Sequence, residues 1–155
     1  MVSPIPTLLT TQFLLSHLLQ SPRLPRRSLH KTSNVAPRQD LTHFPTKDLS
    51  PSTINMLLRW EAAQQNAMDN FPIFVAAVLF ASFKGVSEDT VASAGWCYVG
   101  ARLAYWVSYV VVERVKWSFA RSVFWWVGNG VCFWLLREGG RAWVDGGIGV
   151  RGEGR

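Results

Sequence analysis

The sequence predicts an all-α protein, a transmembrane helical bundle with three strong spans and a short or degenerate first helix. Apolar side chains make up 48% of the 155 residues and charged side chains only 17%, which is a low charge content for a soluble domain of this length. Between Phe71 and Leu136 lie three long apolar stretches that are separated by short polar segments. We therefore expect membrane lipid to surround the helices.

Residues 1–50 are expected to form a separate amino-terminal segment. Its apolar run, Leu8 to Leu19, is shorter than the roughly 20 residues that cross a hydrocarbon core. A Pro- and Arg-rich stretch follows, and no acidic residue precedes Asp40, as in a mitochondrial presequence. The run is either a degenerate first helix or part of a targeting or aberrant amino terminus, and the sequence of residues 1–33 leaves both readings open.

A long helix is predicted from about Ser52 to Phe83, because hydroxyl side chains at Ser50 and Thr53 can cap its first amides and Pro51 suits a first turn. Its first turns are amphipathic, and all polarity is lost after Phe71. We expect a kink near Pro72 and entry of the second half into the bilayer.

Two further spans are predicted, from Val91 to Val112 and from about Phe119 to Leu136. Several tryptophans lie near their predicted ends, as in an interfacial belt. Glycines within these spans can let helices approach closely; they are Gly95, Gly100, Gly128 and Gly130. Residues 51–137 thus form the transmembrane unit.

The tail, residues 138–155, is rich in glycine and is expected to be disordered. Lys and Arg are more frequent in the segment before the long helix and in the Glu113–Lys116 loop than at the opposite end of the bundle. This distribution predicts that the former side is cytoplasmic.

The formal charge of +6 is compatible with nucleic-acid binding in principle, but the basic residues precede the first strong span, where a membrane protein keeps its cytoplasmic charge. We therefore expect no nucleic-acid partner. Cys97 and Cys132 stand alone in apolar stretches and are expected to be packing residues, and the scattered histidines have no spacing typical of metal ligands. No metal site is predicted.

Arg102 is the most informative polar residue within a predicted span, because an ionised Arg at mid-bilayer costs on the order of 2.5–3.5 kcal/mol without a partner. Tyr105 and Tyr109 follow it along one helix face. Such a stripe can hold a carboxylate-bearing ligand through charge-assisted hydrogen bonds. The alternative is an ion pair of Arg102 with Asp69 or Glu61 that locks the bundle.

A second polar seam is predicted on the long helix, where Arg59, Asn66 and Asp69 or Asn70 fall on adjoining turns of one side. For Arg59 a solvated helix end is the simpler explanation. Arg121 lies in the first turns of the last span, at the same membrane level as these groups. Its simplest interpretation is a cation that extends to the membrane interface.

Four segments, taken together and in order, resemble the MAPEG family, the membrane-associated proteins in eicosanoid and glutathione metabolism. Arg59-Trp-Glu-Ala-Ala-Gln-Gln-Asn66-Ala-Met-Asp69-Asn70-Phe71-Pro72 resembles the second helix of the family. Ala101-Arg102-Leu-Ala-Tyr105 with Tyr109 resembles the third helix, Ala120-Arg121-Ser122 the fourth, and Asn34-Val-Ala-Pro37-Arg38 the first loop.

The resemblance implies a four-helix bundle that assembles as a homotrimer and binds glutathione, as a co-substrate, between neighbouring subunits near the cytoplasmic face. It implies that Arg121 is the catalytic residue that activates the thiol, since a fixed cation beside a thiol favours the reactive thiolate. The residues that it implies for glutathione binding are Arg38, Asn66, Asp69, Arg102, Tyr105 and Tyr109, with Arg59 as a weaker candidate.

The sequence departs from the eicosanoid branch at Ala62 and Asn70, and Asp69 stands where the family usually has Glu, so leukotriene or prostaglandin chemistry is not expected. The function implied is a glutathione-dependent transferase or peroxidase, microsomal glutathione transferase-like, that acts on hydrophobic electrophiles. Its expected location is the endoplasmic reticulum, with a mitochondrial membrane as the alternative. The rival interpretation is a non-catalytic membrane protein whose polar seam serves oligomer packing.

Overall fold

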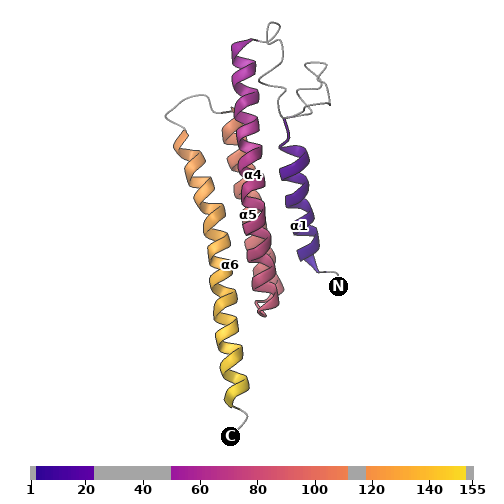
Figure 1. Cartoon of the computed structure of the whole chain (residues 1–155), viewed down its shortest axis with the longest axis vertical. Coiled ribbons are helices and arrows are strands. Elements are labelled where there is room, and N and C mark those ends of the chain that lie inside the picture. The colour runs from indigo at the N-terminus through magenta and orange to yellow at the C-terminus, as the bar shows by residue number, and fades with distance from the viewer. Residues whose placement is uncertain (1–2, 23–49, 112–117, 153–155) are drawn as a thin grey trace.

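The structure, a computed structural model, describes residues 3–22, 50–111 and 118–152, which form helices that stand side by side in a bundle (Figure 1). In chain order they are α1 (Pro4–Leu14), which continues into a short π-helical segment η1 (Leu15–Leu19), then α4 (Pro51–Phe83), α5 (Glu88–Val111) and α6 (Ser118–Gly152). Successive helices run in opposite directions (Figure 1). The predicted all-α bundle is confirmed for these residues.

The apolar run near the amino terminus forms a first helix that packs against α4 and α5. Ser3 caps it, since its Oγ accepts a hydrogen bond from the backbone N of Ile5 at 3.2 Å. Leu8 is fully buried, and the C-terminal end is tied to α4 by Nε1 of Trp60, which donates to the backbone O of Gln20 at 2.8 Å. The sequence left open whether this run is a first helix or part of a targeting or aberrant amino terminus. In the structure it forms a short first helix that packs on the others.

Helix α4 begins where the sequence predicted. The Oγ of Ser50 accepts from the backbone N of Thr53 at 3.2 Å, and Pro51 occupies the first turn. Pro72 lies inside the helix, which continues through it to Phe83. The predicted boundaries are therefore correct to within a residue.

The turn between α4 and α5 depends on Gly85. Its backbone φ is 87°, a value that residues with a Cβ rarely adopt. Its backbone N donates to the O of Ser82, and the N of Val86 donates to the O of Ala81, so carbonyls at the end of α4 are satisfied. Helix α5 then starts with acidic residues, which match the positive end of the helix dipole.

Among the described helices, α4 alone is both long enough and apolar enough to be a candidate membrane span. Helices α5 and α6, with 24 and 35 residues, have the required length but not this hydropathy. The Trp, Tyr, Gly and Arg residues of these two helices lower their mean hydropathy. The sequence analysis expected three strongly apolar spans, and for α5 and α6 this expectation was wrong, because their mean hydropathy is too low.

The core lies between α1, α4, α5 and α6 and includes Leu8, Val78, Val91, Cys132 and Leu135. At its centre the rings of Phe74 and Tyr98 stack, with centroids 4.0 Å apart. Cys132 is a buried packing residue, as predicted, whereas Cys97 is exposed, so the same prediction was wrong for Cys97.

Helix α6 continues to Gly152 and extends past the α4–α5 turn (Figure 1). The prediction of a disordered tail from residue 138 was therefore wrong for residues 138–152. Specific contacts support the extension. Nζ of Lys84 lies 4.0 Å from the ring centroid of Trp143, and Nη1 of Arg141 lies 3.2 Å from Oε1 of Glu138.

Four glycines were predicted to let helices approach closely, and the structure confirms this for two of them, Gly95 and Gly128. A Cβ on Gly95 would collide with Leu8 of α1, and a Cβ on Gly128 would lie 3.3 Å from Nε of Arg102. For Gly100 and Gly130 the prediction was wrong within the described residues, because no atom lies within 4 Å of a Cβ built there.

We predict that Gly95→Val destabilises the protein in detergent by about 1–3 kcal/mol, because the new side chain displaces the buried Leu8 and overpacks the α1–α5 contact. Gly100→Val is the matched control, with the same change in helix propensity but open space around the site. Thermal unfolding followed by circular dichroism measures both. Equal midpoints for the two variants would mean that α1 does not pack on α5 as described.

Candidate functional site

Arg102 on α5 is the most deeply buried cation of the described residues, with 1% of its surface exposed. Its Nη1 donates to Oδ1 of Asn66 on α4 at 3.2 Å. Its Cζ lies 5.0 Å from the ring centroid of Tyr98, and Gly128 on α6 leaves room for the guanidinium. Three helices therefore enclose this side chain.

Two of the three guanidinium nitrogens of Arg102, Nε and Nη2, are buried and have no hydrogen-bond partner within the part of the chain that the structure describes. A buried cation with unmet donors is costly, and such donors are normally satisfied by an anion or a polar partner. The guanidinium fork suits a carboxylate, which can accept two parallel hydrogen bonds. The geometry thus favours an anionic ligand at this position.

A series of aromatic rings leads from Arg102 to Arg121 on α6. The rings of Tyr105 and Tyr109 lie 5.0 Å apart, and Cζ of Arg102 lies 6.0 Å from the centroid of Tyr105. Cζ of Arg121 lies 4.5 Å from the centroid of Tyr109. Two cations therefore lie at the two ends of one tyrosine pair.

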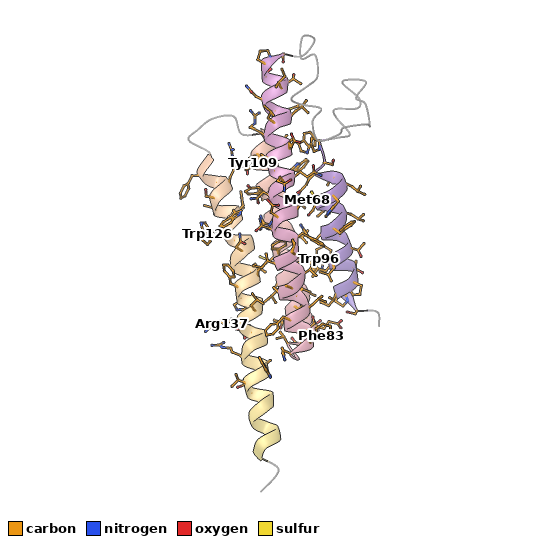
Figure 2. All side chains as sticks on the ribbon, viewed as in Figure 1. Met68, Phe83, Trp96, Tyr109, Trp126 and Arg137 are labelled. Carbon is orange, nitrogen blue, oxygen red and sulfur yellow. The ribbon has the colours of Figure 1, made fainter. Side chains whose placement is uncertain are left out.

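Arg59 joins the same group from α4, because its Nε donates to the backbone O of Tyr109 at 3.2 Å. Arg59 and Arg121 are half-buried, as is the side chain of Tyr109 between them. Figure 2 shows Tyr109 toward the opposite end of the bundle from Phe83 and Arg137. The site accordingly lies on the side of the α5–α6 connection, the side that the charge distribution predicts to be cytoplasmic.

One predicted site residue of the described part of the chain, Asp69, is not part of this cluster. Asp69 is exposed, and its Oδ1 accepts from Nε2 of Gln65 on the same helix at 2.8 Å. Arg38 lies outside the described residues. The alternative interpretation paired Arg102 with Asp69 or Glu61, whereas the acceptor described for Arg102 is the amide oxygen of Asn66.

Sequence reasoning assigned no contact to Tyr98 and missed the role of Asn70. Asn70 is 9% exposed, and its Nδ2 lies 3.3 Å from Oδ1 of Asn66, so it helps to orient that amide toward Arg102. The hydroxyl of Tyr98 donates to the backbone O of Asn70 at 3.2 Å. The i, i+4 spacings of Asn66 with Asn70 and of Tyr98 with Arg102 are the signal that could have found them.

The arrangement can perform two chemical tasks. The unmet donors of Arg102 can bind an anionic group in a buried, weakly screened position. Arg121 lies on the other side of the Tyr105–Tyr109 pair and can place positive charge beside a second group of the same ligand. There it would favour an anionic nucleophile such as a thiolate. A small molecule with a carboxylate and a thiol fits both positions.

Comparison with known families supports the resemblance noted in the sequence. A family model described as the MAPEG family matches residues 6–138, which covers most of the chain and includes every described candidate residue. A search of curated proteins finds no match to the chain. The family match ends within α6, which continues to Gly152.

We predict that Asn66→Ala lowers the free energy of unfolding by about 1.5–3 kcal/mol, because it removes the described hydrogen-bond acceptor of a buried guanidinium. Gln65→Ala is the matched control on the neighbouring exposed position, and we expect a change within about 0.5 kcal/mol. Chemical denaturation in detergent measures both. A wild-type stability for Asn66→Ala would show that Arg102 does not depend on this amide.

Proposed function

The chain belongs to the MAPEG family, and we propose that it is a glutathione-dependent transferase or peroxidase that acts on hydrophobic electrophiles at a membrane. Membership makes it a helical membrane protein of a family concerned with eicosanoid and glutathione metabolism. The glutathione, its activation by Arg121 and the electrophile are parts of the proposal.

The observation that carries the proposal is the pair of unmet donors on the buried Arg102. Glutathione has two carboxylates, and one of them can accept from Nε and Nη2 as a bidentate partner. Binding would then supply the anion that a cation in a lipid-embedded bundle needs. Asn66 and Tyr98 hold the guanidinium in place for this contact.

Arg121 is the proposed activator of the thiol. Its guanidinium stacks at 4.5 Å over the Tyr109 ring, which fixes its position on the same side of the bundle as Arg102. A cation held beside the sulfur favours ionisation, and the thiol proton passes to water. In a transfer reaction the thiolate sulfur forms a bond to an electrophilic carbon while the leaving group departs with its bonding electrons.

The electrophile is proposed to arrive from the lipid. Around Arg121 the surface of α6 is strongly apolar, with Phe119 74% exposed and Trp126 61% exposed. A hydrophobic molecule dissolved in the bilayer can reach the thiolate along this surface without crossing water. We also propose that neighbouring copies complete the site in a homotrimer, within the endoplasmic reticulum or, alternatively, a mitochondrial membrane.

A non-catalytic membrane protein is the second candidate. One observation favours it: Arg102 already joins α4 to α5 through Asn66 and packs against α6 at Gly128. A cation that only locks helices together would need no ligand. Ligand binding separates the two candidates.

We predict that the thiolate absorbance of glutathione bound to the purified protein falls about tenfold or more in Arg121→Ala, because an adjacent cation shifts ionisation by at least this factor. Arg137→Ala is the matched control, since Arg137 is an exposed arginine of the same helix at the opposite end of the bundle (Figure 2). Equal spectra for wild type and Arg121→Ala would remove Arg121 from the mechanism.

We predict that glutathione binds in detergent with measurable heat, and that Arg102→Gln weakens binding at least about tenfold. Isothermal titration with glutathione and with a carboxyl ester of glutathione tests the contact itself. The ester should bind the wild type weakly and should distinguish little between wild type and variant. No heat with glutathione, from a protein that keeps its oligomeric mass, would support the non-catalytic candidate instead.

A further inference from the structure

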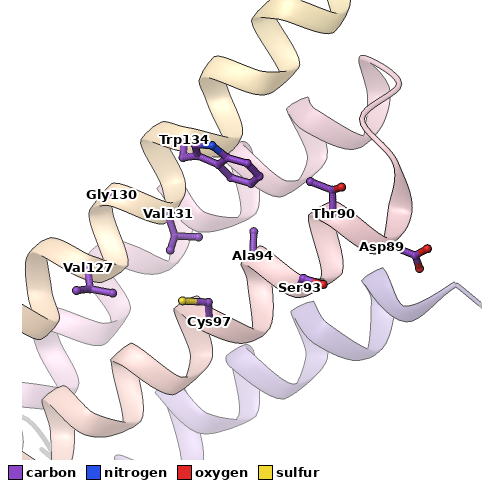
Figure 3. Close-up of a pocket in the computed structure, with 9 residues that line it drawn as sticks. All are labelled: Asp89, Thr90, Ser93, Ala94, Cys97, Val127, Gly130, Val131 and Trp134. Atoms are coloured by element: carbon purple, nitrogen blue, oxygen red, sulfur yellow. The ribbon is translucent and has the colours of Figure 1, made fainter.

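Helices α5 and α6 line two adjoining grooves, which together extend from the middle of the bundle to the end opposite to Arg121. The first, here called the apolar groove, has a volume of about 650 Å³, and its walls include Ala94 and Cys97 of α5 and Val127 and Val131 of α6 (Figure 3). The second, here called the polar groove, has a volume of about 550 Å³. Thr90 and Trp134 line both grooves, so the two adjoin each other.

The polar groove is formed by the α4–α5 turn, the start of α5 and the part of α6 from Trp134 to Asp145. Of its α6 residues, Arg141, Ala142 and Asp145 lie beyond the family match. Its charged residues are Glu138, Arg141 and Asp145, two carboxylates and one guanidinium. Arg141 is exposed, and its Nη1 lies 3.2 Å from Oε1 of Glu138. The groove therefore offers both signs of charge, with an excess of negative charge.

From the shared walls of these two grooves and the charges of the polar groove we propose that the protein binds a phospholipid with a zwitterionic headgroup. Its ammonium group lies against the carboxylates of Glu138 and Asp145, and its phosphate lies against Arg141. One acyl chain lies in the apolar groove between α5 and α6. The occupant is a lipid of the surrounding bilayer.

The geometry of the bundle matches the orientation of a lipid. The polar groove lies at the end of the bundle, beside Ser87, where α5 begins and the chain has just turned. From Thr90 to Cys97 the apolar groove follows α5 toward the middle of the bundle over about 10 Å, at about 1.5 Å per residue. A lipid with its headgroup at the membrane surface and its chain toward the bilayer centre has this same direction.

Charge complementarity selects the headgroup class. An anionic headgroup would bring negative charge to a groove that already holds two carboxylates and only one guanidinium. A zwitterionic headgroup satisfies both signs, and Trp134, 40% exposed between the grooves, adds an aromatic face that attracts an ammonium group. The apolar groove in turn gives the acyl chain contacts that a free headgroup lacks.

The experiment measures lipid retained by the full-length protein, by native mass spectrometry after equilibration with mixed micelles of phosphatidylcholine and phosphatidylglycerol. We expect retained phosphatidylcholine for the wild type. Gly130→Phe fills the apolar groove and should reduce retention at least about tenfold, the factor that a loss of about 1.4 kcal/mol gives. No atom lies within 4 Å of a Cβ at Gly130, so the new side chain starts in open space, and circular dichroism of the variant checks that the helices are retained.

Gly100→Phe is the matched control, because Gly100 is a second helical glycine with open space and does not line either groove. It should retain lipid as the wild type does. The double variant Glu138→Lys, Asp145→Lys reverses the charge of the polar groove and should change the preference to phosphatidylglycerol. Maleimide labelling of Cys97 gives an independent readout, since bound phosphatidylcholine should slow it in the wild type but not in Gly130→Phe.

Several outcomes would overturn the proposal. Equal retention in Gly130→Phe and Gly100→Phe would exclude an acyl chain from the apolar groove, and an unchanged lipid preference in the double lysine variant would exclude the polar groove. Protection of Cys97 by free phosphocholine would remove the acyl chain from the site. A change of oligomeric mass in Gly130→Phe, with lipid retention unchanged, would assign the groove to a second copy. None of these results bears on glutathione binding at Arg102.

Discussion

The guanidinium of Arg102, enclosed at 1% exposure between α4, α5 and α6, is the constraint on which this bundle depends. A buried cation must be held in place by neighbouring side chains, which must also meet some of its hydrogen-bond donors. Asn66 on α4 accepts a hydrogen bond from Arg102, and the ring of Tyr98 on α5 packs against the guanidinium. Gly128 is needed on the third, because a larger residue would press on Nε. Two donors of Arg102, Nε and Nη2, remain without a partner among the described residues. The arrangement that holds the helices together is therefore also a place where an anion can bind.

Much of the fold could be predicted from the sequence, because its signals are local. The cap at Ser50 and Pro51 and the loss of polarity after Phe71 defined α4 to within a residue. The end of α6 could not be predicted in this way. Glycine-rich sequence favours disorder by composition, and the contacts that hold the extension, such as Lys84 on Trp143, join residues far apart in the chain.

The candidate site could be predicted in part. Spacing along single helices placed Arg102, Tyr105 and Tyr109 on one face, and the structure keeps them together with Arg121. Spacing could not decide which way a polar residue of α4 faces relative to α5. Asp69 accordingly turned out exposed, while the amide of Asn66, one turn earlier, meets the guanidinium. The rotation of packed helices depends on side-chain fit across the interface, which a single sequence does not contain.

The shortness of the first helix has a consequence for the membrane itself. The 11 residues of α1 and the five of η1 extend about 24 Å at about 1.5 Å per residue, whereas α4 has 33 residues. A hydrocarbon layer is about 30 Å thick, so one flank of the bundle has a hydrophobic mismatch that the other lacks. Acyl chains beside α1 must compress or tilt to cover it. Such local thinning costs less in a thin bilayer than in a thick, sterol-rich one.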